Sequence, residues 1–255
     1  NAWQTGTAMK RSSLVELLDL FYAHGGGKAL VERRGLRTVR WSYRHVADTA
    51  SQFARELEAR EIGPGERVVL WGPNSVEWVA ALWGCLLRGA VAVPMDHIAA
   101  PDFAARVAQQ VDARLVLTTR ERVGLDASRP ALALEDLEAH VARYPTRRYR
   151  PLQLSRSDTT EIIFTSGTTA EPRGVVLTHG NLLANLEPLE TEIAKYRKWE
   201  RWFHPLRFLN LLPLSHVFGQ FLGVFIPPVL GATVVFQESL NPAEVMRTIK
   251  RERVS

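Results

Sequence analysis

The chain has 255 residues with a formal net charge of +5, and 46% of the residues are hydrophobic and 23% charged. This length can bury a sizeable core in one or two domains, and the ordinary composition excludes a low-complexity chain. The single cysteine excludes an intrachain disulfide, no apolar run is long enough to span a bilayer, and no block of lysine and arginine favours a nucleic-acid partner. Because no signal peptide is recognisable, a cytoplasmic location is the default expectation.

Two helices are predicted before the first predicted strand. Ser13-x-x-Glu16 has the form of a capping box, and apolar residues with helical spacing follow it as far as Phe21. The glycines at 25–27 should end this helix. Residues 43–60 predict the second helix.

From residue 67 onward, predicted strands and helices alternate. The strands are expected at 67–71, 91–94 and 115–118, and the helices at 75–87, 101–111 and 137–144. Such alternation is typical of parallel strands joined by crossover helices. The sequence therefore predicts an α/β fold of doubly wound, mostly parallel sheets flanked by helices, with ligands bound beyond the carboxyl ends of the strands.

A polar, arginine-rich segment at residues 145–160 is the best internal boundary. We therefore expect a first α/β subdomain over residues 1–150 and the beginning of a second over residues 151–255. The second part contains predicted strands at 208–212 and 233–236 and predicted helices that start near 181, 217 and 241. Because the alternation predicts another strand after Ser255, the chain is expected to be the amino-terminal part of a longer enzyme.

Residues 162–177 combine two apolar strands with a loop of small and hydroxylated residues. The glycines at 167 and 174 allow backbone conformations that other residues avoid, so main-chain N–H groups can converge on one point. The hydroxyls of Ser166, Thr168 and Thr169 and the charge of Arg173 add donors for a polyanion, and a nucleoside triphosphate fits them best. A Walker A loop is excluded because an apolar strand, and not a helix, follows the loop. The alternative is an ordinary hairpin turn.

His216 is the second candidate, since it follows Pro213-Leu214-Ser215 at a predicted strand-to-helix turn. Such turns often hold functional side chains in α/β sheets. The alternative is a capped, hydrogen-bonded histidine without a role in function. The other histidines are scattered, and no spacing of His, Cys, Asp and Glu predicts a metal site. His179 is interpreted as structural, and Cys85 as a small core residue.

Four segments together resemble the adenylate-forming superfamily, whose members include acyl-CoA synthetases, fatty-acyl-AMP ligases and peptide-synthetase adenylation domains. Thr165 to Gly174 resembles its phosphate-loop signature, and Leu211 to Gly219 resembles its aromatic/His motif. Trp41-Ser42-Tyr43 and Leu87 to Asp96 are weaker matches in the same order. The overall likeness is to a bacterial-type long-chain fatty acid–CoA ligase.

The resemblance implies the chemistry and the roles of the site residues. Such enzymes use ATP and Mg²⁺ to convert a carboxylic acid to an acyl-adenylate and then transfer the acyl group to CoA. Catalysis of this displacement is mostly positioning and charge stabilisation. His216 would position the substrate carboxylate, and the ATP phosphates would be bound by Thr165, Ser166, Gly167, Thr168, Thr169 and Arg173.

Two residues of the loop depart from the family pattern. Arg173 stands where lysine is commoner, and it keeps the positive charge. Ala170 stands where glycine or serine is usual, and a Cβ there is costly if the backbone needs a positive φ. We interpret Ala170 as a variant that preserves function.

Several alternatives remain open at the level of the sequence. The family completes its site with a glutamate for Mg²⁺, an aspartate for ribose and a mobile lysine, all in segments that these residues lack. We therefore expect residues 1–255 alone to be inactive. The alternatives to a CoA ligase are a fatty-acyl-AMP ligase or adenylation domain that loads a carrier protein, and a non-catalytic nucleotide- or acyl-binding module.

Residues 195–207 mix five basic side chains with four aromatic ones. One interpretation is a peripheral contact with anionic lipid, which would suit an enzyme that takes fatty acids from membranes. The other is a surface helix whose tryptophans pack on the core, and it is favoured because the segment is short. The expected partners are a small-molecule carboxylate, ATP and CoA, without nucleic acid.

Overall fold

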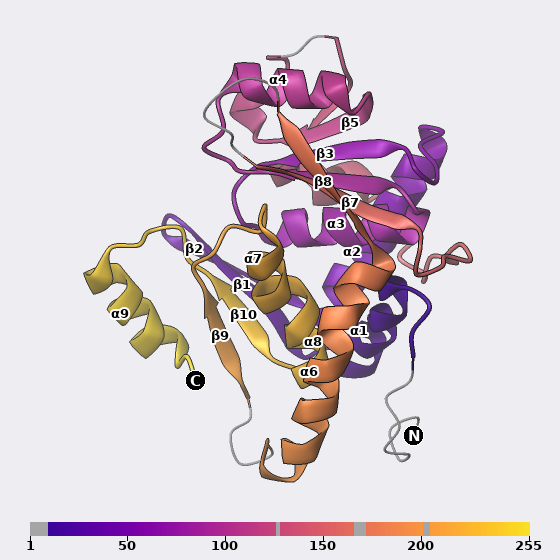
Figure 1. Ribbon diagram of the computed structural model, residues 1–255. Helices are drawn as coiled ribbons and strands as arrows, with labels where there is room; N and C mark the ends of the chain where they lie inside the picture. The colour runs from indigo at the N-terminus through magenta and orange to yellow at the C-terminus, as the bar shows by residue number, and fades with distance from the viewer. Residues whose placement is uncertain (1–9, 126–127, 166–171, 201–204) are drawn as a thin grey trace.

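The fold consists of two β-sheets with helices between and around them (Figure 1). The computed structural model describes residues 10–125, 128–165, 172–200 and 205–255, and within these ranges the side chains of Thr165 and of residues 196–200 are not described. In the described part no helix is both long enough and apolar enough to cross a membrane.

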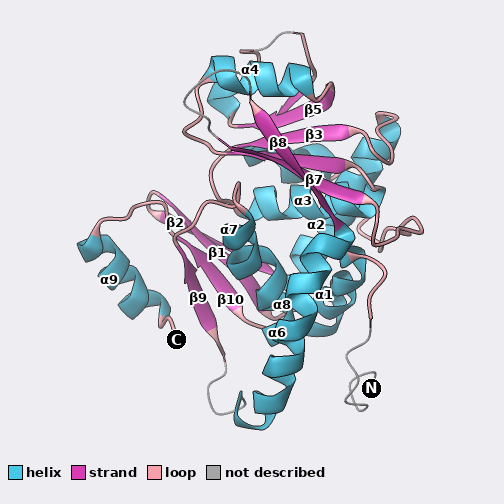
Figure 2. Cartoon of the chain, in the orientation of Figure 1, coloured by secondary structure: helices cyan, strands magenta, loops and turns pink. Residues whose placement is uncertain are grey.

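The larger sheet has six strands in the order β6-β5-β3-β4-β7-β8. All neighbours in it are parallel except β7 and β8, which form an antiparallel pair. Helix α4 (Pro101–Gln110) packs on one face, and α2 (Tyr43–Ala59) and α3 (Val76–Arg88) lie on the other (Figure 2). The strands are β3 (Arg67–Trp71), β4 (Val91–Met95), β5 (Ala113–Thr118), β6 (Ala131–Ala133), β7 (Thr159–Thr165) and β8 (Arg173–Thr178).

The smaller sheet has the order β2-β1-β10-β9, with only β1 and β2 antiparallel. Its strands are β1 (Lys28–Arg34), β2 (Arg37–Ser42), β9 (Arg207–Asn210) and β10 (Thr233–Phe236). Both sheets thus take strands from each side of residue 150, so they do not follow the predicted division at that residue. The predicted fold class is confirmed, because both sheets are mostly parallel and are flanked by helices.

The remaining helices connect or cover the sheets. They are the 3-10 turns η1 (Leu14–Leu17), η2 (Arg120–Arg122) and η3 (Leu134–Asp136), the helices α1 (Leu18–His24), α5 (Leu137–Val141), α6 (His179–Glu200), α7 (Val217–Gln220), α8 (Ile226–Leu230) and α9 (Pro242–Glu252), and a π-helix at Phe221–Phe225. The predicted helix at 217–225 is therefore present but changes from α to π geometry after Gln220. Short π segments within helices are frequently found at functional sites.

The predicted strand at 67–71 and the predicted strand at 233–236 match β3 and β10 residue for residue. The hairpin of β1 and β2 was not predicted. Its two strands are largely polar, and burial changes irregularly along them, so the period-2 signal of a half-buried strand is weak. Gly35, with a φ of +58°, forms the turn between them.

The interior lies mainly between α2 and α3, beneath the larger sheet. Gly84 permits this packing, because a Cβ there would lie 2.6 Å from a ring atom of Phe53 and 3.0 Å from the carbonyl oxygen of Ala50. Trp78 and Trp83 are among the largest fully buried side chains. Cys85 is fully buried as the sequence predicts, and burial raises the pKa of its thiol.

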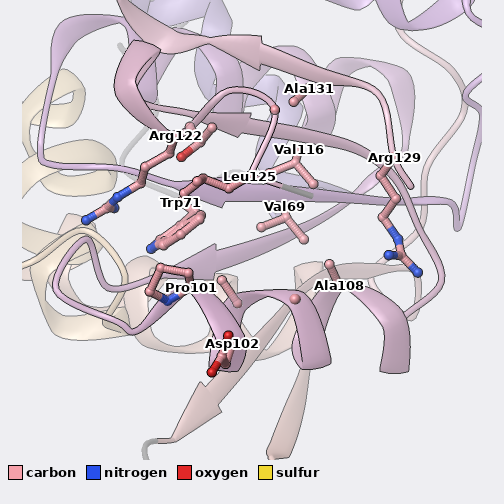
Figure 3. A pocket seen from close by; sticks show the side chains of 14 residues that line it. Val69, Trp71, Pro101, Asp102, Ala108, Val116, Arg122, Leu125, Arg129 and Ala131 are labelled. Carbon is pink, nitrogen blue, oxygen red and sulfur yellow. The ribbon is translucent and has the colours of Figure 1, made fainter. Parts of the chain in front are cut away.

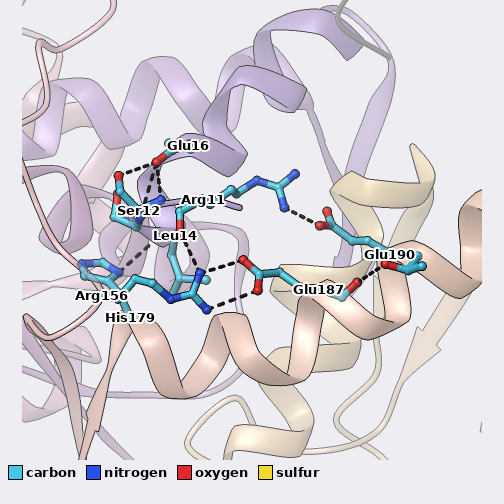
Figure 4. Close-up of polar contacts among 10 residues, drawn as sticks. Arg11, Ser12, Leu14, Glu16, Arg156, His179, Glu187 and Glu190 are labelled. Carbon is cyan, nitrogen blue, oxygen red and sulfur yellow. Dashed lines mark hydrogen bonds and ion pairs between the residues drawn. The ribbon is translucent and has the colours of Figure 1, made fainter. Parts of the chain in front are cut away.

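The N-terminal segment is anchored to the first turns of α6 (Figure 4). The Leu14 N–H donates to His179 Nδ1 at 3.2 Å, and Arg156 pairs with Glu187 at 2.8 Å. His179 is buried, and this burial lowers its pKa to about 4, so it is neutral and accepts the bond from Leu14. The structural interpretation of His179 is confirmed, and α6 is fixed where it follows β8.

Candidate functional site

The site forms at the carboxyl ends of β4 and β7. These strands are parallel, and Ala92 pairs with Glu161. Four residues farther along each strand the chain reaches Asp96 and Thr165, so the end of β4 adjoins the entrance to the predicted phosphate loop. Ligands of doubly wound sheets bind at this kind of edge.

Of the predicted phosphate-binding residues, the structure describes two. The backbone of Thr165 pairs with Arg173 across β7 and β8, which places both at the base of the loop. Arg173 is exposed, and its side chain makes no hydrogen bond or ion pair with another described residue, so its guanidinium is available to an anion. Ser166, Gly167, Thr168 and Thr169 lie outside the described residues, as does Ala170.

Gly174 serves a different purpose from the one that the sequence suggested. It lies within β8 and is absent from the glycines with positive φ. A Cβ at this position would lie 2.7 Å from Ile162 Cγ2 and 3.0 Å from the Phe164 ring. Glycine is needed here because the apolar side chains of β7 cover its Cα, and not because the backbone is left-handed.

His216 lies immediately before α7, and its side chain forms no cap hydrogen bond with that helix. Its Nε2 is 3.9 Å from Asp96 Oδ2, and 59% of its side-chain surface is exposed. Both residues line a cavity of about 300 Å³ together with Phe103, Phe164 and Ser215. The cavity therefore has an apolar wall, an imidazole and a carboxylate, and it lies at the same edge of the larger sheet as Arg173.

Backbone contacts fix the turn that presents His216. Asn74, just after β3, accepts a hydrogen bond from the Leu214 N–H and donates one to the Leu212 carbonyl, both at 2.8 Å. Gly219 allows the turn to close, because a Cβ there would lie 2.1 Å from the Pro213 carbonyl oxygen. The side chain of the adjacent Phe218 is 65% exposed, and the structure gives it no core packing role.

Sequence reasoning missed Asn74 and Asp96 as residues of the site. The signal for both was their position, since each follows the carboxyl end of a correctly predicted strand. What the sequence did not provide was the order of the strands, which brings β3, β4 and β7 together. Among the described residues no group of three His, Cys, Asp or Glu side chains could hold a metal ion.

A second cavity, of about 100 Å³, lies on the face of the larger sheet that α4 covers (Figure 3). Val69, Val116 and Leu125 gather around it, and the Arg122 guanidinium lies over the Trp71 ring at 4.3 Å. None of the predicted site residues lines it, so the candidate site is the His216 cavity.

The comparisons with known proteins agree with this geometry. The chain is 31% identical over 211 residues to an L-proline–[L-prolyl-carrier protein] ligase of Pseudomonas fluorescens, a match that covers 76% of this chain and 39% of that protein. It is 28% identical over 227 residues to the long-chain-fatty-acid–CoA ligase FadD13 of Mycobacterium tuberculosis, covering 85% and 43%. The chain thus spans less than half the length of these relatives.

The fold has close counterparts among solved structures. A fatty acid AMP ligase from Legionella pneumophila superposes with a TM-score of 0.76 at 24% identity, over 97% of this chain and 44% of that one. A family model described as AMP-binding enzyme matches residues 23–255. The chain therefore belongs to the AMP-binding enzymes, the adenylate-forming family.

Proposed function

We propose that the protein uses ATP to activate a carboxylic acid as its acyl-adenylate. The observation that carries this proposal is the shared edge of the larger sheet, where the base of the phosphate loop adjoins the His216 cavity. A substrate carboxylate in that cavity would lie beside the triphosphate that Arg173 and the loop bind. Holding the two reactants at one edge is the main contribution a protein makes to such a displacement.

In this proposal each candidate residue has a defined task. Thr165, Ser166, Gly167, Thr168, Thr169 and Arg173 bind the phosphates of ATP. Arg173 supports this role because it is exposed and unpaired among the described residues. His216 orients the carboxylate, and Phe103 and Phe164 supply the apolar wall for the acyl group. Mg²⁺, when bound, would neutralise phosphate charge.

We further propose a medium- or long-chain fatty acid as substrate and CoA as acceptor. The fatty-acid–CoA ligase among the relatives and the apolar wall of the cavity support this choice. A carrier protein is the alternative acceptor, and the prolyl-carrier ligase supports it. The peripheral membrane contact stays a separate proposal, because much of 195–207 lies outside the described residues or has undescribed side chains.

The test is ATP–pyrophosphate exchange by the protein of the complete reading frame, against carboxylates of graded chain length. We expect exchange that depends on the carboxylate and increases with chain length. Transfer to CoA or to a carrier protein then separates the two acceptors. Nucleotide binding without exchange for any carboxylate would contradict the enzyme and favour a binding module. Residues 1–255 alone are expected to be inactive, and exchange at full rate by them would refute that part.

A further inference from the structure

A buried glutamate lies four residues before the end of β7. Glu161 has no exposed surface, and neither has Gln220, the last residue of α7. Gln220 Nε2 donates to Glu161 Oε2 at 2.8 Å. A fully buried glutamate is uncommon unless it is paired, and here its partner is a neutral amide.

The same amide group also reaches the turn that presents His216. Gln220 Nε2 donates a second hydrogen bond, of 2.9 Å, to the Leu214 carbonyl. One amide therefore joins β7, which enters the phosphate loop at Thr165, to the turn just before His216. The two halves of the candidate site are connected through this single side chain.

The hydrogen-bond inventory of this cluster lacks one donor. Both N–H groups of Gln220 are used, whereas Glu161 Oε1 and Gln220 Oε1 are buried and have no hydrogen-bond partner among the residues that the structure describes. An ionised carboxylate only accepts, so it leaves both oxygens unsatisfied. A proton on Glu161 supplies the missing donor, and buried polar groups are costly when they remain unpaired.

The surroundings of Glu161 also favour the protonated form. Burial raises the pKa of Glu161 to about 7, although the hydrogen bond from Gln220 acts in the opposite direction. The titratable side chain that interacts with it is Cys85 of α3, whose pKa is itself raised by burial. Cys85 therefore stays neutral, and as an acid it has no positive form that could stabilise an ionised glutamate.

We propose that Glu161, carrying its proton, and Gln220 form a positioning pair that fixes the His216 turn relative to the phosphate loop. The pair touches neither ATP nor the carboxylate, and it acts through Leu214 and the strand β7. The expected effect on pyrophosphate exchange rests on the proposed function, whereas the expected anchoring of the His216 turn does not. When Glu161 ionises, Glu161 Oε1 and Gln220 Oε1 are both acceptors without a donor, so only one side of the amide remains held by the glutamate.

The first experiment measures the turn itself and does not need catalysis. Amide hydrogen exchange of the peptide over residues 212–220 is compared in wild type, E161L, Q220L and E161Q. We expect faster exchange in E161L and Q220L, and wild-type exchange in E161Q, because a neutral amide can replace a neutral acid. E252Q is the control, since Glu252 is a buried glutamate of α9 that pairs with Arg251. Unchanged exchange in E161L would overturn the proposal even if the enzyme is active.

The second experiment follows pyrophosphate exchange between about pH 6 and pH 8. We expect kcat/KM for the carboxylate to fall at least about tenfold in E161L and Q220L, with the Kd for ATP nearly unchanged. Wild-type activity should fall as the pH rises through about 7, and the activity of E161Q should not show this decrease.

The outcomes separate this inference from the proposed function. Equal loss in E161Q and E161L at low pH would contradict the neutral pair in an enzyme that still works. Absence of exchange in wild type would contradict only the proposed function, because the hydrogen-exchange comparison still decides whether the pair anchors the turn. An infrared band of a buried protonated carboxyl group, present in wild type and lost in E161Q, would support the proton directly.

Discussion

His216 Nε2 lies 3.9 Å from Asp96 Oδ2, although the two residues follow strands of different sheets. Asp96 follows β4 of the larger sheet, and the turn of His216 follows β9 of the smaller one. Asn74, after β3 of the larger sheet, holds that turn through the Leu212 carbonyl and the Leu214 N–H. The cavity is therefore a product of the packing of the two sheets, and its shape depends on contacts that cross between them.

Replacing His216 by alanine should weaken carboxylate activation without weakening nucleotide binding. The imidazole is largely exposed in the cavity and has no cap hydrogen bond, so its loss costs little stability. We expect kcat/KM for the carboxylate in pyrophosphate exchange to fall at least about tenfold, the effect of losing a hydrogen bond to a charged group. H45A is the control, because His45 is a half-buried histidine of α2 that pairs with Glu138 and does not line the cavity. A full rate in H216A would remove His216 from the site.

Arg173 should contribute mainly to ATP binding. R173A is expected to raise the KM for ATP at least about tenfold, whereas R173K should retain most of the affinity because the charge remains. The matched control is R40A, an exposed arginine of β2 in the smaller sheet. If R173A and R40A had the same small effect, the guanidinium would not bind phosphate. Isothermal titration with a non-hydrolysable ATP analogue measures the affinities directly.

The alternating part of the chain could be predicted closely because its apolar runs are continuous. Strands such as β3 and β4 are buried on both faces, so their sequences are apolar runs that almost no polar residue interrupts. The hairpin of β1 and β2 lacks that signal, and nothing local says that β1 pairs with β10 at the far end of the chain. The site followed the same rule: His216 and Asp96 each stand in a local motif, whereas their contact depends on how the two sheets pack together.

Glu56 should be a major stabilising residue of α2. It is buried, and burial alone would raise its pKa, but hydrogen bonds from His140, Arg143, Arg60 and Tyr144 outweigh burial and lower it to about 2. E56Q should lower the free energy of unfolding by about 2 kcal/mol near neutral pH, since the partly exposed donors lose charge-assisted hydrogen bonds to this buried carboxylate. E58Q, at an exposed neighbour, is the control. The contribution should be present above about pH 4.5 and lost as the pH falls through about 2.

His179 predicts a loss of stability at moderately acidic pH. Its pKa in the folded protein is about 4, against 6.5 for the free side chain, because it is buried against the N-terminal segment. Between these values the unfolded chain binds a proton that the folded chain does not. Stability is therefore fully present above about pH 6.5 and falls as the pH decreases toward about 4, by about 3 kcal/mol in total.

The variant H179N isolates this effect, because asparagine can still accept the hydrogen bond from the Leu14 N–H but does not titrate. We expect H179N to be less stable than wild type near neutral pH, since the smaller side chain leaves space in the core. The difference should shrink as the pH falls from about 6.5, because only the wild type loses stability there through this group. Urea unfolding at several pH values measures how stability changes with pH in wild type and H179N, with H45N as the control for a partly exposed histidine. The same pH dependence in wild type and H179N would mean that folding does not lower the pKa of His179.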